Sequence, residues 1–508
     1  MTEAIPVLVA GGGPVGLAVA LEIAHQGIRS VVIEPREEVS WLRPRAKTTS
    51  ARTMELFRRW GLAEQVRARA ALPVGWSDRA VFTTGLLGRE ITHIDHCFGL
   101  DLTGDHRAAE PGQQIPQPAV EQVLRDTISG SPLVTLRTGW RVVDLTEDEH
   151  GVTAAVIDPH GQAQRIRAEF LVGADGATST VRAAIGARYE GSADERPNYN
   201  IVFRSPGLAD RVPHGPAVHY WVLHPTHPGM LGRLDLADTW WCIAQNLPQQ
   251  AGDADPLGVV RGLVGADIPA EILATDPWKA KLLLADRYHS DRVFLAGDAA
   301  HLNPPWGGHG FNTGIGDAVN LGWKLAAVLR GWAPRSLLPS YQDERRPIAA
   351  RTIAEAARNM SILAPELSDA RLTGTDAEFA AVRARVAEAV HRDKSGEFHS
   401  LDLVLDYTYQ GSPLVGARSG ARLPHHWLGP GESLYDLLGP GFTLLGPAQH
   451  PLIGPFTDAA AEHRIPLHVV ARSGHRLTLI RPDQHVAWTD TEPGTPREVL
   501  RRATGYPR

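Results

Sequence analysis

The chain has 508 residues, of which 51 are lysine or arginine and 57 are aspartate or glutamate, so its formal charge is −6. This length predicts two to four domains, and 43% hydrophobic with 21% charged residues is ordinary for a soluble globular protein. Because like charges form no blocks and the only cysteines are Cys97 and Cys242, we expect no nucleic-acid partner, no disulfide framework and no bound metal.

The N-terminal residues predict a strand and not a signal peptide. Residues 5–10 form a continuous apolar run, which is typical of a strand buried on both faces. No basic segment precedes this run, and no uninterrupted apolar stretch reaches the roughly 18 residues of a membrane span. We therefore expect a cytoplasmic protein that does not contact a membrane.

A glycine-rich turn follows this strand directly. It reads Gly11-Gly12-Gly13-Pro14-Val15-Gly16, which matches G-x-G-x-x-G. A helical apolar pattern then runs to Gly27, a typical residue just beyond a helix, and a second apolar run ends at Glu34. Strand, glycines, helix and acid at these spacings predict a dinucleotide-binding βαβ unit.

The residues of this motif have separate roles. Gly11 permits the tight turn, Gly13 lets the backbone approach a pyrophosphate, and Gly16 allows the helix to pack closely on the strand. Glu34 follows Gly16 by 18 residues, where a carboxylate accepts hydrogen bonds from a ribose and disfavours a 2′-phosphate. Since the motif occurs once, we expect one tightly held dinucleotide, and a second nucleotide must bind by other means.

Two later strands end in acidic turns. Asp175-Gly176 follows the apolar run in residues 169–173, and Gly297-Asp298 follows the run over residues 293–296. Ligands of open α/β sheets bind at the carboxyl ends of the strands. A single D-G or G-D pair is usually a turn that binds no ligand. The prediction of a ligand site therefore rests on the presence of both pairs, in this order, after the glycine motif.

In this combination the chain resembles the single-component (group A) flavoprotein monooxygenases, the FAD-dependent aromatic hydroxylases related to p-hydroxybenzoate and phenol hydroxylases. That family carries the glycine motif with its distal glutamate, then the D-G motif, then the G-D motif. The resemblance covers roughly residues 5–360 and includes ARTMELFRRWGL at 51–62, the prolines and glycines of 304–314 and YQDERRP at 341–347. Two residues depart from the family pattern: Trp306, and His309, where many relatives have glutamine. Both are expected beside the flavin, so they bear on which substrate the pocket accepts.

The resemblance implies tightly, non-covalently bound FAD and a set of binding residues. A helix that starts at Asn312 or Thr313 and stops at Gly331 would direct its N–H groups at the pyrimidine edge of the flavin. The expected FAD-binding residues are Gly11, Gly13, Pro14, Gly16, Glu34, Arg45, Gln117, Val142, Asp175, Asp298, Pro305, Gly308, Gly310, Phe311 and Asn312.

The segment between the two acidic turns has strand-like pieces that would form an antiparallel sheet over the flavin. In the family this sheet holds the substrate. The expected pocket residues are Tyr220, Trp221, Trp241, Pro305 and Trp306, and simple core packing is an open alternative for each aromatic residue.

The fold class expected is α/β: a Rossmann-like FAD-binding domain, an inserted antiparallel-sheet substrate domain and a thioredoxin-like C-terminal domain. Because no cysteine follows Cys242, the C-terminal domain lacks C-x-x-C chemistry. The expected boundaries are 1–75, 100–185 and 285–395 for the FAD-binding domain, 76–99 and 190–284 for the substrate domain, and 400–508 for the C-terminal domain.

The resemblance implies an NADPH- or NADH-dependent monooxygenase that uses O2 and a flavin C4a-hydroperoxide to hydroxylate a phenolic or polycyclic, polyketide-like aromatic compound. The overall pattern resembles antibiotic-pathway hydroxylases. Baeyer–Villiger oxidation by the same peroxide and a flavin oxidoreductase without oxygen insertion remain alternatives. The catalytic base is unknown, with His309 as a candidate, and a homodimer is a working hypothesis.

Overall fold

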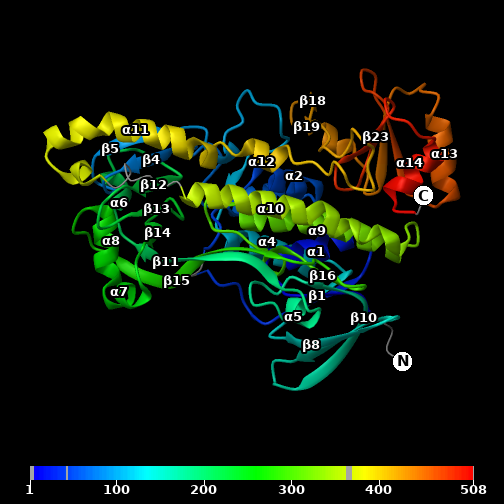
Figure 1. Cartoon of the computed structure of the whole chain (residues 1–508), viewed down its shortest axis with the longest axis horizontal. Coiled ribbons are helices and arrows are strands. Elements are labelled where there is room, and N and C mark those ends of the chain that lie inside the picture. The colour runs from blue at the N-terminus through cyan, green and yellow to red at the C-terminus, as the bar shows by residue number, and fades with distance from the viewer. Residues whose placement is uncertain (1–4, 42–43, 362–368, 507–508) are drawn as a thin grey trace.

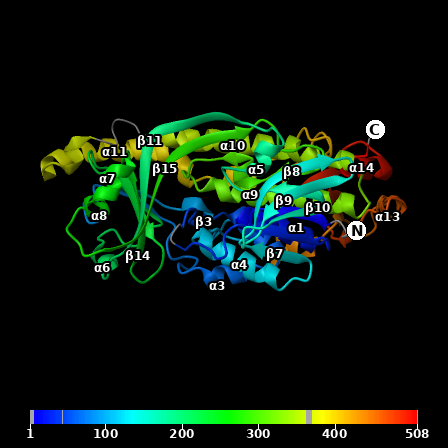
Figure 2. The same ribbon diagram turned by 90° about the horizontal axis from the view of Figure 1, so that it is seen from below.

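The computed structural model describes residues 5–41, 44–361 and 369–506, which form two large sheets and a smaller C-terminal unit (Figures 1 and 2). The first sheet has the order β7-β2-β1-β10-β9-β8, and β16 also pairs with β10. Strands β7, β2, β1, β10 and β16 are parallel, while β9 and β8 extend the sheet antiparallel to β10. Their bounds are β1 Ile5–Ala10, β2 Ser30–Glu34, β7 Val134–Thr138, β8 Arg141–Asp148, β9 Gly151–Ile157, β10 Ala163–Gly173 and β16 Val293–Leu295.

Helices cover this sheet because its central strands are apolar on both faces. The predicted strand over residues 5–10 is confirmed, and the helix that follows it is α1 (Pro14–His25). Helix α1 packs against α4 (Gln117–Ser129) and α9 (His309–Leu329). The predicted stop of α1 at Gly27 is also confirmed, since Gly27 has φ +76° just beyond the helix.

The second sheet has eight strands in the order β17-β15-β11-β14-β13-β12-β4-β5. Strands β11 and β15 are paired along their length and are the longest strands of this sheet, as Figures 1 and 2 show. Helices α6, α7 and α8 lie at this end of the molecule. Bounds are β4 Ala80–Thr83, β5 Glu90–Ile94, β11 Tyr189–Arg204, α6 Leu208–Arg211, β12 His219–Val222, β13 Gly229–Arg233, β14 Thr239–Gln245, α7 Gln249–Ala254, α8 Pro256–Val264, β15 Glu271–Ala285 and β17 His301–Leu302.

Alternation along the strands of the second sheet divides its aromatic residues between two faces. Trp221 and Trp241 join a buried cluster with Trp306 on one face. Tyr220 and Trp240 point to the other face, where they pack in a cluster with residues of α8 such as Val260. Tyr220 therefore faces away from the other aromatic residues expected in the pocket, because a neighbour of Trp221 in a strand must face the opposite way, and its contact with substrate stays a prediction.

Helix α11 (Asp376–Phe398) packs on the second sheet. The expected domain division instead put residues up to 395 with the FAD-binding domain. Val382, Val386 and Val390 recur at intervals of four along α11 and join the buried cluster of the second sheet. Such a spacing marks an apolar helical face, but it does not determine which sheet the face covers.

The C-terminal unit contains a βαβ unit followed by a hairpin and a helix. Its sheet has the order β21-β20-β22-β23, with β20 and β21 parallel and the other pairs antiparallel. It joins the rest of the chain through a core in which Trp323 and Trp332 meet Phe442. Bounds are β20 Phe442–Gly446, α13 Ile453–Glu462, β21 Leu467–Ala471, β22 Thr478–Ile480, β23 Val486–Thr489 and α14 Pro496–Ala503.

The remaining elements are short connections and two further helices that pack near α9. Helix α2 begins after Ser50, whose hydroxyl accepts from the N–H of Thr53. The bounds are β3 Thr48–Thr49, α2 Ala51–Arg59, α3 Ala63–Arg69, β6 Gln113–Gln114, α5 Thr180–Ala184, α10 Ser340–Ser361, α12 Leu401–Leu405, β18 Trp427–Gly429 and β19 Glu432–Ser433.

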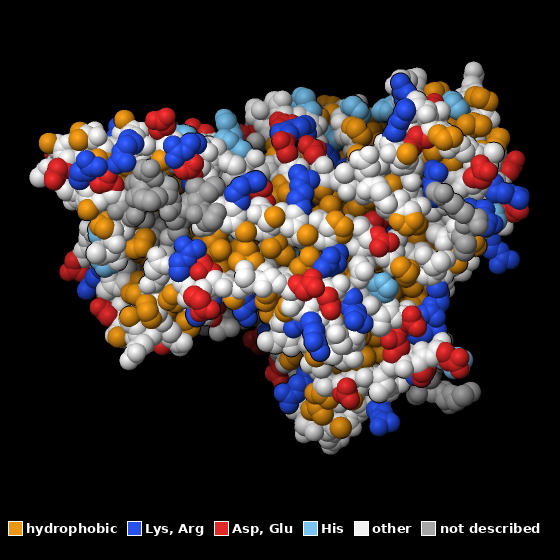
Figure 3. Space-filling model, in the orientation of Figure 1, with side chains coloured by type: hydrophobic (Ala, Val, Ile, Leu, Met, Phe, Trp, Pro, Cys, Tyr) orange, Lys and Arg blue, Asp and Glu red, His pale blue; other side chains and the backbone are white. Residues whose placement is uncertain are grey.

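Basic and acidic side chains are interspersed over the face that Figure 3 shows. Within the described ranges, no helix is both long and apolar enough to cross a membrane. The same residues contain no group of three His, Cys, Asp or Glu side chains that could hold a metal ion. Cys97 and Cys242 are both buried free thiols.

Candidate functional site

The glycine turn after β1 is shaped by two different demands. A Cβ atom on Gly11 (φ +102°) would lie 2.2 Å from the carbonyl oxygen of Ala174, and one on Gly16 would lie 1.9 Å from the carbonyl oxygen of Gly11. A Cβ on Gly13, by contrast, would meet no atom within 4 Å. Gly11 and Gly16 are therefore required by the fold itself, whereas the open space beside Gly13 fits a ligand that needs close approach to the backbone.

Helix α1 starts at this open space. Its N-cap is Gly13, which provides no side-chain hydrogen bond, and Pro14 is the first helical residue. The N–H groups of the first turn are thus not capped by this residue, and they carry the partial positive charge of the helix N-terminus. This arrangement suits the pyrophosphate of a dinucleotide.

Glu34 lies at the carboxyl end of β2 and turns toward the glycine loop. Its Oε2 accepts from the N–H of Gly12 at 2.7 Å, while Oε1 accepts from the N–H of Arg36 at 2.9 Å and from its guanidinium Nε at 2.7 Å. Glu34 is only 3% exposed, and these donors orient its carboxylate. Its remaining lone pairs suit the hydroxyls of a ribose.

A second helix N-terminus belongs to α9, and it begins earlier than the sequence predicted. The N-cap is Gly308 (φ +68°), so the prediction of Asn312 or Thr313 as N-cap is wrong. Asn312 lies inside the first turn and ties the helix to β3: its Oδ1 accepts from the N–H of Ser50 at 2.9 Å, and its Nδ2 donates to the carbonyls of Gly308 and Thr48. The predicted stop at Gly331 (φ +74°) is confirmed.

The two helix N-termini meet at the turn that contains Asp298. A Cβ on Gly314 or Gly297 would lie within 3 Å of the Val15 side chain, so α1, α9 and this turn are in close contact. Asp317 of α9 fixes the turn by accepting from the N–H of Gly297 at 3.1 Å. Asp298 itself is exposed at this junction.

Asp175 acts on this junction indirectly. Its carboxylate accepts from the Ser179 hydroxyl and from the N–H of Val181, and burial raises its pKa. These bonds hold α5, whose Arg182 donates to the carbonyl of Ala299 at 3.2 Å, next to Asp298. The D-G motif therefore positions the Asp298 turn, whereas direct contact between Asp175 and FAD remains a prediction.

Three other predicted cofactor residues are less closely grouped. Gln117 begins α4, and its N–H donates to the carbonyl of Ala46 at 2.8 Å, which places it beside Arg45. Arg45 has φ +37°, an uncommon backbone conformation for a residue with a side chain. Val142 lies in β8, on the antiparallel extension, and packs half-buried against the core of the first sheet. Their contacts with FAD remain predictions.

The loop before α9 faces the second sheet. Pro305 is exposed, while Trp306 is buried and packs on Trp278 of β15 with ring centroids 6.0 Å apart. We define the aromatic face as Trp221, Trp241, Trp278 and Trp306. Trp278 donates to Asn200 at 2.7 Å, but the indole N–H groups of the other three are buried without an acceptor in the described part of the chain.

Unsatisfied buried donors are costly, about 1 to 3 kcal/mol each. The Asn303 amide, in the loop that carries Trp306, is also buried without a partner among the residues described. Several such groups around one apolar face fit a pocket for an aromatic ligand that carries hydrogen-bond acceptors.

We expect Gly232→Ala to weaken the binding of aromatic ligands about tenfold, which corresponds to about 1.4 kcal/mol. A Cβ on Gly232 would lie 2.7 Å from three atoms of the Trp241 indole, so the ring would have to leave its place on the sheet. Titration calorimetry on the FAD-loaded protein measures the effect. Tyr220→Phe, on the opposite face, serves as control and should leave affinity unchanged; equal affinities for Gly232→Ala and wild type would contradict this account of the pocket.

His309 is the first residue of α9. It lines a second cavity of about 420 Å³, whose other lining residues come from the segment around α2, from α9 and α10, and from residues 403–407. Its ring packs against Gly307, and burial lowers its pKa to about 4. None of the four tryptophans of the aromatic face lines this cavity, and the role of His309 as a base stays a prediction.

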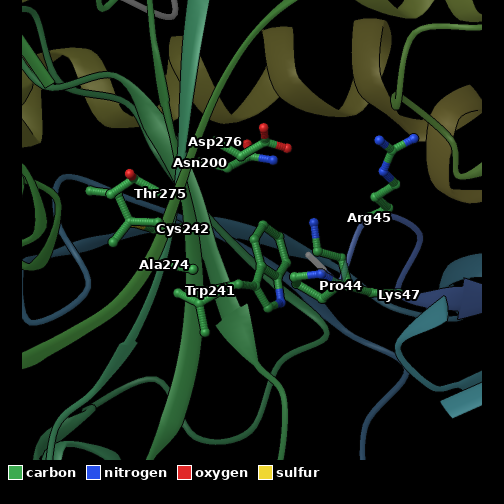
Figure 4. A pocket seen from close by; sticks show the side chains of 11 residues that line it. Pro44, Arg45, Lys47, Asn200, Trp241, Cys242, Ala274, Thr275 and Asp276 are labelled. Carbon is green, nitrogen blue, oxygen red and sulfur yellow. The ribbon is translucent and has the colours of Figure 1, made fainter. Parts of the chain in front are cut away.

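Sequence reasoning missed part of the substrate side of the site. A cavity of about 320 Å³, which includes open solvent, lies between the loop of Pro44, Arg45 and Lys47 and the strands β11, β14 and β15 (Figure 4). Asn200 and Trp241 line it from the sheet. The lysine stands within RPRAKTTSART, beside the predicted Arg45, but its residue type alone gave no signal for a role.

Comparisons with known proteins match the whole chain. The family description "FAD binding domain" matches residues 4–356, and "Aromatic-ring hydroxylase, C-terminal" matches residues 416–507. Tetracenomycin B2 monooxygenase-dioxygenase of Streptomyces olivaceus is 34% identical over 98% of this chain and 97% of its own, and 2,4-dichlorophenol 6-monooxygenase of Delftia acidovorans is 30% identical over 95% and 94%.

Solved structures agree with these matches. The rebeccamycin biosynthetic enzyme RebC with reduced flavin superposes with a TM-score of 0.92, at 32% identity over 99% of each chain. A ternary complex of aklavinone-11 hydroxylase with FAD and aklavinone superposes with a TM-score of 0.82, at 26% identity over 99% of this chain and 100% of the other.

Proposed function

Since the chain belongs to the FAD-binding aromatic-ring hydroxylase family and is an FAD-dependent monooxygenase, we propose that its substrate is a phenolic or polycyclic, polyketide-like aromatic compound and that NADPH or NADH supplies the electrons. The observation that carries the proposal is the aromatic face, where Trp221, Trp241 and Trp306 present buried, unpaired indole N–H groups. Relatives named for tetracenomycins and aklavinone support a polycyclic substrate.

FAD, when bound, accepts electrons from the nicotinamide and activates O2 for transfer to the ring. The residues present fit it: the open space at Gly13 would take the pyrophosphate, Glu34 the ribose, and the turn of Asp298 the sugar-alcohol chain. The uncapped N-terminus of α9 at Gly308 would then stabilise negative charge on the flavin ring.

The chain's own contribution to the reaction is orientation and exclusion of water. The aromatic face would hold the substrate ring flat between the second sheet and the loop of Pro305 and Trp306. Where the bound substrate and the apolar side chains exclude water, hydrogen bonds and charges act more strongly than they do in water. We further propose that the C-terminal unit is a thioredoxin-like scaffold without redox cysteines, and that residues 76–99 and 190–284 form the substrate domain.

The test is to incubate the FAD-loaded protein with NADPH or NADH in air, together with phenols and hydroxylated anthraquinones. Substrate-stimulated NAD(P)H consumption with a product that has gained one ring oxygen supports the proposal. An ester or lactone product would instead establish Baeyer–Villiger oxidation. NAD(P)H consumption that never yields an oxygenated product with any of these compounds would favour a flavin oxidoreductase.

A further inference from the structure

Lys47 is held in a fixed position against the aromatic face. Its Nζ lies 4.2 Å from the centroid of the Trp241 ring, and it lines the cavity shown in Figure 4. The residue that follows it, Thr48, is tied to α9 by the Asn312 side chain. Lys47 thus lies where the loop that contains Pro44 and Arg45 meets the second sheet.

Lys47 differs from Lys324 and Lys394, which are buried and each form an ion pair. Lys324 donates to Glu344 at 2.6 Å, and Lys394 donates to Glu397 at 3.1 Å. In the described part of the chain no carboxylate lies within ion-pair distance of Lys47, and burial lowers its pKa to about 8. An ammonium group that is partly withdrawn from water and has no counter-ion is unfavourable for folding, which favours a functional reason for keeping it.

Most of the groups around Lys47 are hydrogen-bond donors or neutral, and Asp276 is acidic. Arg45 lines the same cavity. Burial lowers the pKa of His219 to about 3, so its ring is neutral, and its Nδ1 is buried without a partner among the residues described. The indole N–H of Trp241 is equally unpaired. Asp276 is the acidic residue that lines the cavity, and it has an interaction of its own, so it is not a free carboxylate.

We propose that Lys47 binds an anionic oxygen of the substrate, a ring carboxylate or an ionised phenol, while the substrate ring lies on the aromatic face. This inference rests on the proposed function and narrows it to acidic aromatic compounds. The ligand's anion would supply the counter-ion that the fold omits, and Arg45 would add to the positive potential at the cavity.

The experiment is a calorimetric titration of the FAD-loaded enzyme with matched pairs of probes. The carboxylate arm uses naphthoate and anthraquinone carboxylate, each against its methyl ester; the phenolate arm uses hydroxyanthraquinone against its methyl ether. The variants are Lys47→Met and the charge-retaining Lys47→Arg. Lys279→Met, which removes a half-exposed lysine paired with Glu195, is the control.

We expect wild type to bind the acid at least tenfold more tightly than the neutral partner in one arm. Lys47→Met should abolish that preference without changing the affinity for the neutral probe, while Lys47→Arg and Lys279→Met keep it. The arm that shows the preference identifies the anion as carboxylate or phenolate. If neither arm shows a preference in wild type, or if Lys47→Met retains it, the inference is wrong, whether or not the enzyme hydroxylates aromatic rings.

Two further readouts separate this role from a structural one. Because burial lowers the pKa of Lys47 to about 8, the preference for the carboxylate probes, which stay ionised throughout this range, should decline as the pH rises through 8. The neighbouring titratable groups do not titrate near this pH, since burial lowers the pKa of His219 to about 3 and raises that of Cys242 to about 12. Lys47→Met should melt at the same or a higher temperature than wild type; a clearly lower melting temperature would contradict the proposal that the charge is kept for binding.

Discussion

Replacing Gly13 by valine is expected to lower FAD affinity at least about a hundredfold, or about 2.7 kcal/mol, while the chain still folds. Gly13 has φ −73° and ψ 177°, an extended conformation that any residue adopts. A Cβ there meets no protein atom within 4 Å, so the valine side chain fits the protein alone. It would occupy the space that the pyrophosphate needs at the N-terminus of α1.

The measurement is FAD binding to the apoprotein, followed by flavin fluorescence, together with the melting temperature of the apoprotein. Gly454→Val is the matched control, because a Cβ on Gly454 also meets nothing within 4 Å and the residue lies in α13 of the C-terminal unit. Undiminished FAD affinity in Gly13→Val would mean that the ligand does not approach this backbone. A collapse in apoprotein stability would mean that the glycine serves the fold instead.

Replacing Arg481 by leucine is expected to destabilise the protein by about 3 to 5 kcal/mol, because it removes the guanidinium group that pairs with two buried carboxylates. Arg481 donates to both oxygens of Glu344, at 2.5 and 2.7 Å, and to Asp483 at 2.6 Å. Glu344 lies on α10 and also accepts from Lys324 of α9, whereas Arg481 belongs to the C-terminal unit. This buried network therefore joins the C-terminal unit to the helix that would face the flavin.

The urea midpoint of unfolding, with the melting temperature as a second probe, measures the loss. Arg497→Leu is the control, since its ion pair with Glu462 is exposed and should contribute about 0 to 1 kcal/mol. The cations around Glu344 and Asp483 lower the pKa of both carboxylates, so wild type should lose stability as the pH falls below about 4.5, where the unfolded chain becomes protonated. A loss below 1 kcal/mol for Arg481→Leu would contradict the assigned role of the network.

Local signals in the sequence predicted the first βαβ unit well. The strand over residues 5–10, the end of α1 before Gly27 and the glycine roles at Gly11 and Gly16 all follow from short-range patterns. They could be predicted because a tight turn and a close helix–strand contact exclude a Cβ wherever they occur. The stop of α9 at Gly331 follows from the same local rule.

Features that depend on distant partners could not be predicted in this way. Asn312 has the side chain of an N-cap residue, but it is used to hold Ser50 and Thr48, some 260 residues earlier in the chain. Tyr220 and Trp221 are equally aromatic, and only the register of the sheet decides which of them faces Trp306. Among the residues that the structure describes, the lack of a carboxylate within ion-pair distance of Lys47 is likewise a property of the assembled fold.

The most direct test of the central claim, oxygen transfer to an aromatic ring bound on the aromatic face, is to run the reaction under heavy-isotope O2 with the FAD-loaded wild-type enzyme. We predict a ring-hydroxylated product that carries one labelled oxygen atom, in an amount that depends on NADPH or NADH and falls in Gly232→Ala. A product whose added oxygen comes from water, or reduction of all the O2 to peroxide with every aromatic compound supplied, would contradict the claim.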